Sequence, residues 1–343
     1  MGRRLIPYRQ HWPILITMVG GAAMVAEGLF FLMAPPASEA QPAMHPTPAP
    51  IDGRRAFGYL EQICKIGPRI AGTEANTQQR RMVAEHFRKC GLTVREQPFV
   101  AVHPLTGHRV DMANLIGAWH PERLHRLVLC AHYDTRPHAD EEINPDRLGL
   151  PFIGANDGGS GVALLMEIAH HLDAIASSYG IDLVLFDGEE LVYGNNPRRG
   201  EYFLGSTIFA RTYASQRSDR SRARVQYVGG ILFDMVGGKE MVIKREPNSV
   251  ELAPALVRDV WGVAASLRSR VFINDFGRRV LDDHLPLNEA GIPTIDIIDF
   301  DYPRWHTTGD VPEACSGASL AQVGRVLTSW LAVPKPAPRT RRR

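Results

Sequence analysis

Four apolar segments of the chain each run into a histidine or an acidic residue. L-V-L-C-A leads to His132, L-V-L-F to the D-G-E-E segment ending at Glu190, G-I-L-F to Asp234, and I-D-I-I to a stretch ending at His306. Short, near-continuous apolar runs are typical of strands buried on both faces of a sheet. Because ligands bind at the carboxyl edge of such sheets, we expect these polar residues to meet there.

Helical and strand patterns alternate along the chain, which predicts one α/β domain. Its central sheet should be mostly parallel or mixed, with helices covering both faces. Helices are predicted at two places within 54–91 and over 158–176, 202–214, 250–268, 283–290 and 319–330. Strands are predicted over 93–102, 109–118, 127–133, 181–186 and 228–235, at 271, and over 294–298.

The two ends of the chain differ from this α/β pattern. Residues 1–34 combine three arginines with a long apolar run, which predicts a cleaved signal peptide or a membrane anchor. Both predictions imply export to a periplasmic or extracellular location. A Pro-rich linker is expected over 35–50, the folded domain over 51–334, and a basic Pro/Arg tail over 335–343.

Composition excludes several classes of protein. With 44% hydrophobic and 22% charged residues, the chain is neither disordered nor a small disulfide scaffold. The net charge is only +2, so nucleic acid is not an expected partner. The four cysteines form no Cys-x-x-Cys pair, which argues against a zinc ribbon or a redox motif and leaves one or two disulfides open.

The acidic residues at the predicted sheet edge need a partner of opposite charge. Each could individually be a helix cap, a turn residue or a solvated surface group. Several carboxylates brought together would instead repel one another unless a cation neutralised them. Imidazole nitrogens and carboxylate oxygens are ligands that Zn²⁺ accepts, so the combined pattern favours a zinc site.

The motifs H-Y-D, G-A-N-D-G-G-S-G, F-D-G-E-E, F-D-M-V-G and W-H-T resemble those of the zinc aminopeptidase superfamily and its relatives, the glutaminyl-peptide cyclotransferases. The resemblance spans about residues 54–331 and implies a zinc-dependent catalytic domain. It implies Glu189 as general base and Asp134 as the carboxylate that orients His132. The implied metal ligands are His132, Asp157, Glu190, Asp234 and His306, with Asp157 bridging.

The resemblance implies a different number of zinc ions for the two branches of this superfamily. A cyclase would hold one Zn²⁺ through Asp157, Glu190 and His306, whereas a peptidase would hold two. Asp282, which precedes Asp-His, matches the cyclase pattern and would pair with Asp234 as a further catalytic carboxylate. Trp305 also matches that pattern and would wall the substrate pocket.

Other residues fit the cyclase branch less well. Cyclases of animals carry a second pocket tryptophan shortly after Glu-Glu, and Tyr193 is the candidate substitute here. Asp299 and Asp301 would suit the α-ammonium group of an aminopeptidase substrate, or would be exposed loop residues. Cys130 lies near a cyclase cysteine position without an obvious partner, so we expect a free, buried thiol.

On balance the residues favour a zinc-dependent cyclotransferase that converts N-terminal glutamine to pyroglutamate and releases ammonia. The alternative is a two-zinc aminopeptidase in which Glu189 activates water. A third hypothesis is a binding domain that has lost the chemistry, although the whole residue set is present. The expected partners are peptides with a free N-terminus, the expected state is a monomer, and only the N-terminal segment should contact a membrane.

Overall fold

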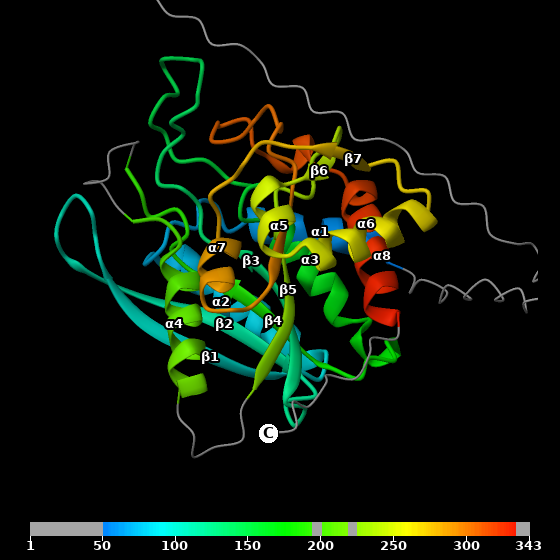
Figure 1. Cartoon of the computed structure of the whole chain (residues 1–343). Helices are drawn as coiled ribbons and strands as arrows, with labels where there is room; N and C mark the ends of the chain where they lie inside the picture. The colour runs from blue at the N-terminus through cyan, green and yellow to red at the C-terminus, as the bar shows by residue number, and fades with distance from the viewer. Residues whose placement is uncertain (1–50, 194–200, 219–224, 334–343) are drawn as a thin grey trace, which may run out of the picture. The chain divides into compact units, whose positions relative to one another are not determined.

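The computed structural model describes residues 51–193, 201–218 and 225–333 (Figure 1). The predicted targeting segment over 1–34, the linker over 35–50 and the basic tail lie outside these residues. Within the described ranges, no helix has both the length and the apolar character needed to cross a membrane.

The centre of the domain is a six-stranded mixed sheet with the strand order β1-β2-β4-β3-β5-β8 (Figure 1). The strands β3, β4, β5 and β8 run parallel, whereas β1 and β2 are antiparallel to their neighbours. A separate pair, β6 and β7, is parallel. The bounds are β1 Thr93–Val102, β2 Arg109–Trp119, β3 His125–His132, β4 Gly180–Phe186, β5 Gln226–Asp234, β6 Ile243–Arg245, β7 Phe272–Phe276 and β8 Thr294–Ile298.

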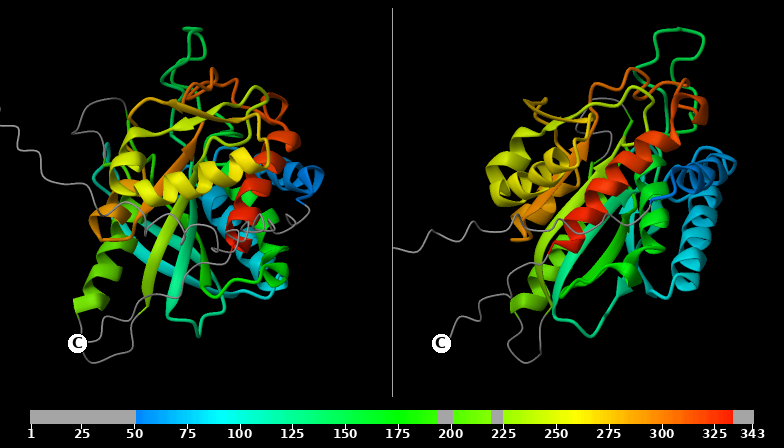
Figure 2. Two further views of the ribbon diagram at one scale, coloured as in Figure 1. Left: turned by 45° about the vertical axis from the view of Figure 1, so that its right-hand side comes forward. Right: turned by 90° about the vertical axis from the view of Figure 1, so that its right-hand side faces the viewer.

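Helices cover both faces of this sheet, as predicted. In the right-hand view of Figure 2, α2 and α4 lie on opposite sides of the strands. The helices α1, α3, α6 and α8 pack with one another on the α2 side, and α7 packs with α4. The bounds are α1 Gly53–Cys64, α2 Glu74–Lys89, α3 Ser160–Ala169, α4 Leu204–Ser218, α5 Pro247–Leu252, α6 Pro254–Ser266, α7 His284–Glu289 and α8 Gly317–Ala332.

The central strand β3 is apolar from Leu127 to Ala131 because each of its faces contributes to a different core. Leu127 and Leu129 belong to the larger core with residues of α1, α3 and α8. Val128 and Cys130 point the other way, into a smaller core with Phe209 of α4. Side chains alternate across a strand, so a strand covered on both faces must be apolar at successive positions.

Some predicted boundaries were wrong. The helix expected over 250–268 is two helices, because Pro254 begins α6 and a proline fits the first helical position but not a helix interior. The helix expected over 158–176 is α3 followed by a short 3₁₀ turn, Leu172–Ala174. The strand β6 was not predicted.

The cysteines are unpaired in this structure. Cys130 is free and fully buried, as predicted, and its thiol lies 3.6 Å from the carbonyl oxygen of Ile231. Cys64, Cys90 and Cys315 are also free, so neither of the disulfides left open by the sequence is present.

An ion pair is buried at the end of the sheet where β3 begins. Arg126 donates two hydrogen bonds to Asp182 on β4, at 2.6 and 3.0 Å, and both side chains are at most 5% exposed. The guanidinium also donates to the carbonyl oxygens of Trp119 and Ile181, and the Tyr227 hydroxyl donates to Asp182. Each charge therefore depends on the other for compensation.

We predict that Asp182→Ala lowers the free energy of unfolding by about 3–5 kcal/mol, because it leaves the Arg126 guanidinium buried without its counter-charge. Chemical denaturation followed by circular dichroism measures this change. The control Lys89→Ala breaks the exposed pair with Glu85 and should cost at most about 1 kcal/mol. Equal effects of the two substitutions would contradict the assigned role of the buried pair.

Candidate active site

The carboxyl ends of the parallel strands bring the predicted polar residues together. His132 is the last residue of β3, and Asp234 is the last residue of β5. Glu189 and Glu190 follow β4, and His306 lies on the loop after β8. The expectation that these strand ends meet at one edge of the sheet is therefore confirmed.

Asp157 lies between the two histidines of this cluster. Its Oδ1 atom is 3.2 Å from Nε2 of His132, and its Oδ2 atom is 3.6 Å from Nε2 of His306. His132 Nε2 is also 3.2 Å from Oδ1 of Asp234, and His306 Nε2 is 2.7 Å from Oε1 of Glu190. Asp157 therefore lies between the two histidines, where the resemblance implies a bridging ligand.

This donor set fits zinc. The Oδ2 atom of Asp157 is buried and has no hydrogen-bond partner in the structure, although it faces other ligand atoms. Two sets of three side chains place their donor atoms within 4.8 Å of one another, and they share Asp157. The first set is Asp157, Glu190 and His306, and the second is His132, Asp157 and Asp234. Either set offers the nitrogen and oxygen ligands that Zn²⁺ prefers.

The glycine-rich loop before α3 fixes the position of Asp157. Gly158 has a φ of 71°, and a Cβ atom there would lie 2.3 Å from the carbonyl oxygen of Asp134. No other residue fits this position without displacing the backbone. Asp310 accepts hydrogen bonds from the backbone N–H groups of Asn156 and Asp157 at 2.9 and 3.0 Å.

The sequence analysis missed two carboxylates that support the ligands. One is Asp310, described above, and the other is Asp140, whose Oδ1 atom is 2.9 Å from Nδ1 of His306. Arg136 in turn donates two hydrogen bonds to Asp140. A carboxylate on the second nitrogen fixes the tautomer of a metal-binding histidine. Both acids lie in loops, where sequence spacing does not reveal which direction a side chain takes.

Asp134 lies next to His132, the residue that it is predicted to orient, and it also holds a backbone segment. Its Oδ1 atom is 3.8 Å from Nδ1 of His132, within reach of an ion pair but longer than a hydrogen bond. Its two oxygens also accept hydrogen bonds from the backbone N–H groups of Glu189 and Glu190, both at 3.0 Å. Asp134 therefore positions the Glu189–Glu190 segment.

Glu189 lines a pocket next to the metal-ligand cluster. Burial raises the pKa of its carboxyl group well above the usual range, and the charge of Glu190 adds to this effect. Its Oε2 atom is 3.8 Å from Nδ1 of His132. A carboxylate with a raised pKa beside a metal site is suited to accept and return a proton, as predicted for the general base.

Asp282 lines the same pocket together with Asp234. Asp282 is almost fully buried, and burial followed by the negative charge of Asp234 raises its pKa well above the usual range. Asp282 also groups with the carboxyl group of Asp296 on β8 and the ring of His284, with donor atoms within 4.8 Å of one another. Asp282 and Asp234 therefore share a pocket, and the hydrogen-bonded pair of the two stays a prediction.

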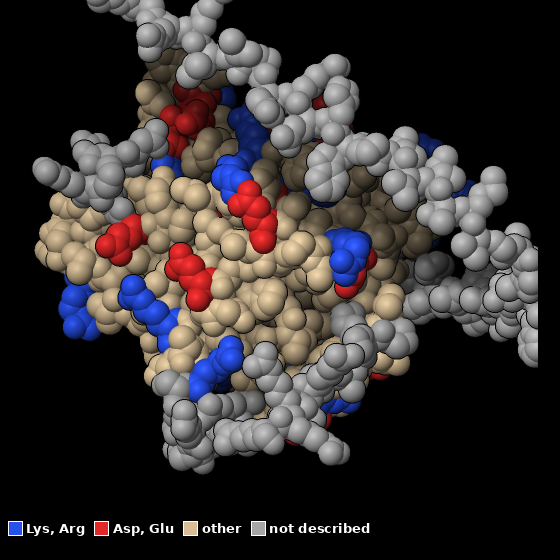
Figure 3. Space-filling view, viewed as in Figure 1, with Lys and Arg blue, Asp and Glu red and all other residues tan. Residues whose placement is uncertain are grey.

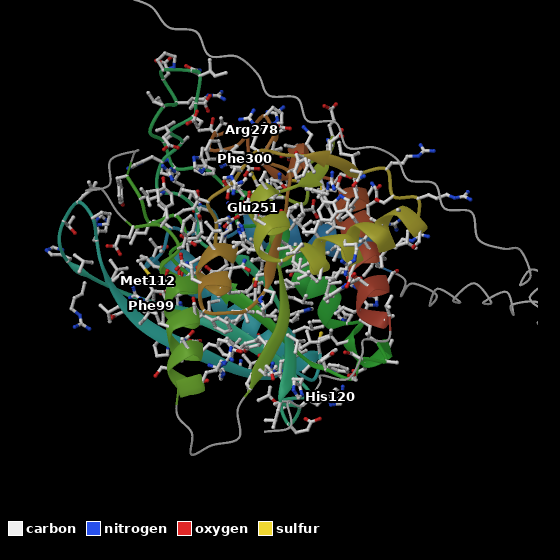
Figure 4. The ribbon with its side chains drawn as sticks, in the orientation of Figure 1. Phe99, Met112, His120, Glu251, Arg278 and Phe300 are labelled. Atoms are coloured by element: carbon white, nitrogen blue, oxygen red, sulfur yellow. The ribbon has the colours of Figure 1, made fainter. Side chains whose placement is uncertain are left out.

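Aromatic side chains form one wall of this pocket of about 320 Å³. The indole of Trp305 stacks on the ring of His306, with centroids 3.9 Å apart and an interplanar angle of 27°. Phe300, labelled in Figure 4, packs against Trp305. Tyr202 and Phe203 also line the pocket. The predicted place of Trp305 is confirmed, whereas these three other aromatic residues were not predicted.

The prediction that Tyr193 lines the pocket was wrong. Its hydroxyl is 3.1 Å from Nε2 of His103, and its ring packs on a small apolar cluster. That cluster includes Phe99 and Met112, which face each other across β1 and β2 (Figure 4). The chain turns away from the pocket before residue 193, because Leu191 is buried in this cluster.

Asp299 and Asp301 do not line the pocket either. Asp299 is buried and accepts hydrogen bonds from the backbone N–H groups of Val242 and Asp301. Asp301 pairs with Lys244 and Arg278. Neither acid is placed to bind the α-ammonium group of a substrate in the pocket.

This chain is similar to a known protein family and to proteins of known structure. A model of "Peptidase family M28" matches residues 114–331. The crystal structure of *Fimbriiglobus ruber* glutaminyl cyclase is 40% identical, with a TM-score of 0.81 over 86% of this chain and 100% of that one. A leucine aminopeptidase precursor from *Bacteroides thetaiotaomicron* is 31% identical, with a TM-score of 0.76 over 84% and 99% of the two chains.

A curated relative from mouse, a glutaminyl-peptide cyclotransferase-like protein, is 24% identical over 82% of this chain and 76% of its own length. The match to the family model covers more than half of the chain, and it includes all of the metal-ligand candidates described above. The chain therefore belongs to peptidase family M28, within the zinc aminopeptidase-like superfamily that includes the glutaminyl cyclases.

Proposed function

We propose that this chain is a glutaminyl-peptide cyclotransferase that converts an N-terminal glutamine to pyroglutamate and releases ammonia. The observation that carries the proposal is the pocket itself. Trp305 stacked on His306 forms one wall, and the paired acids Asp234 and Asp282 line the same space as Glu189. The names of the *Fimbriiglobus ruber* and mouse relatives support the same activity.

The reaction needs a flat, enclosed site for one small side chain. The aromatic wall formed by Trp305 and Phe300 offers an apolar surface for the methylene groups of glutamine. The acids opposite it supply acceptors for the amide and the amine. Because the nucleophile and the electrophile belong to one residue, holding the ring-closing conformation contributes much of the acceleration.

Glu189 carries the proton in this mechanism. The α-amine nitrogen bonds to the γ-carbonyl carbon, and Glu189 accepts the proton that the amine loses. The bond from that carbon to the amide nitrogen then breaks, and Glu189 returns the proton so that ammonia leaves. Asp282 and Asp234, whose pKa values are both raised by burial, orient the reacting amide by hydrogen bonding in this proposal.

One zinc ion is the cofactor in this proposal, held by Asp157, Glu190 and His306. When bound, zinc polarises the γ-carbonyl group of the substrate. Asp140 fixes the tautomer of His306 so that Nε2 faces the ligand set.

The alternative function is that of a two-zinc aminopeptidase. The second set of donors, His132, Asp157 and Asp234, favours it, as does the similarity to the leucine aminopeptidase precursor. Against it, Asp299 and Asp301 do not line the pocket. A binding domain without chemistry is not favoured, because Glu189 lines the pocket with a complete ligand set.

We further propose that the enzyme is exported, through the signal peptide or anchor predicted over 1–34, and acts as a monomer on peptides with a free N-terminus. The charge distribution supports this choice of substrate over nucleic acid. On the face shown in Figure 3, the described basic and acidic side chains are interspersed and form no continuous basic area.

We predict that the purified full chain, supplied with zinc, releases ammonia from a Gln-initiated peptide and leaves a Leu-initiated peptide intact. Mass spectrometry of the two peptides measures both outcomes at once. Release of free leucine would overturn the proposal in favour of the aminopeptidase.

We predict that Glu189→Gln lowers kcat by about 10²–10⁴-fold, because the amide cannot carry the proton. Zinc content and the unfolding curve should stay unchanged, which separates loss of chemistry from loss of fold. The matched control Glu85→Gln alters an exposed glutamate on α2 and should keep full activity. Normal turnover by Glu189→Gln would remove this residue from the mechanism.

We predict that Asp282→Asn lowers cyclisation by at least about 10²-fold, because the amide cannot share a proton with Asp234. The control is Asp301→Asn, the same chemical change at an ion-paired surface acid on the neighbouring loop. Kinetics of both variants with the Gln-initiated peptide measure the difference. If the two variants behave alike, Asp282 is only a packing residue.

A further inference from the structure

A second group of metal-ligand side chains lies away from the active site. His86 and Cys90 are four residues apart on α2 and its C-terminal end, so they lie on one face of that helix. His170 directly follows α3 and meets them from the neighbouring helix. Donor atoms of the three side chains lie within 4.8 Å of one another.

The two sulfur–nitrogen distances in this group are close to those of a tetrahedral zinc site. The Cys90 Sγ atom lies 3.7 Å from Nε2 of His86 and 3.7 Å from Nδ1 of His170. With a zinc–sulfur bond of about 2.3 Å and zinc–nitrogen bonds of about 2.0 Å, a tetrahedral site separates sulfur from nitrogen by about 3.5 Å.

Tyr59 on α1 supports His170 in the way that metal-binding histidines are usually supported. Its hydroxyl is 2.7 Å from Nε2 of His170, which is the nitrogen that faces away from Cys90. A partner on this second nitrogen leaves Nδ1 free to bind a metal and fixes the ring orientation. The rings of Tyr59 and His170 are nearly parallel, with an interplanar angle of 11°.

We propose that His86, Cys90 and His170 form a peripheral zinc-binding site, separate from the catalytic centre. One imidazole from each of two helices and a thiolate are ligands that favour zinc among the common divalent cations. His170 is exposed, so water can complete the coordination. The helix α3, which is about 15 Å long, separates this site from the Asp157 loop at its other end.

The protonation of two side chains must change before zinc can bind. The Cys90 thiol releases its proton to solvent, so the thiolate forms the zinc–sulfur bond. His86 Nε2, which is 2.8 Å from the carbonyl oxygen of Met166, gives up that hydrogen bond as its proton moves to Nδ1. The nearby positive charge of Arg55 does not oppose the metal, because Glu167 pairs with it at 2.7 and 2.8 Å.

Cobalt(II) distinguishes this site from the catalytic one. Thiolate bound to cobalt gives a charge-transfer absorption in the near ultraviolet, whereas the catalytic ligands are only nitrogen and oxygen atoms. We expect this absorption when cobalt is added to the purified full chain. We also expect it in Asp157→Asn, so the result does not depend on the proposed function.

Single substitutions test which side chains bind the cobalt ion. Cys90→Ser and His170→Asn should remove the absorption or shift it to much higher cobalt concentrations, and His170→Asn changes an exposed side chain. Tyr59→Phe should weaken cobalt binding by about 10-fold or more. The exposed His108→Asn is the control and should bind as the parent does. Absence of the absorption from the parent chain, or its persistence in Cys90→Ser, would overturn the proposal.

Discussion

The crowding of negative charge at one edge of the sheet is the constraint on which the rest of the structure depends. Asp157, Glu189, Glu190, Asp234 and Asp282 all line one pocket and are all largely buried. Burying carboxylates so close together is unfavourable without compensation by a cation or by shared protons. The fold accepts this cost because four strands end there and the larger core lies beneath them.

Two further carboxylates fix the backbone segments that carry the crowded acids. Asp134 and Asp310 each accept two backbone N–H groups, and both pairs belong to segments that carry metal-ligand candidates. Arg136 lines the same pocket: it pairs with Asp140, and its own backbone N–H group donates to Glu190. These hydrogen bonds hold the segments of Asp157 and Glu190 in place.

The sequence predicted the parts of the fold that follow from the pattern of apolar and polar residues. The four buried strands, their order along the chain and the residues at their carboxyl ends could be read from apolar runs followed by polar residues. The resemblance to a known family then implied which of those residues would be metal ligands. The supporting residues Asp140 and Asp310 and the pocket residue Phe300 were missed, because they lie in loops whose paths follow tertiary contacts. The wrong place for Tyr193 has the same origin: sequence shows which side chain is near a site, but not its direction.

The pair of hydrogen bonds that Asp134 accepts has a consequence for folding. Asp134 follows β3, whereas Glu189 and Glu190 follow β4, and these two strands are parallel neighbours with His132 opposite Phe186. A slip of one residue between the strands would break both hydrogen bonds and reverse the side of the sheet that each side chain faces. The carboxylate that positions Glu189 and Glu190 therefore also favours the correct register of β3 and β4. A sheet with a shifted register could not assemble a functional pocket.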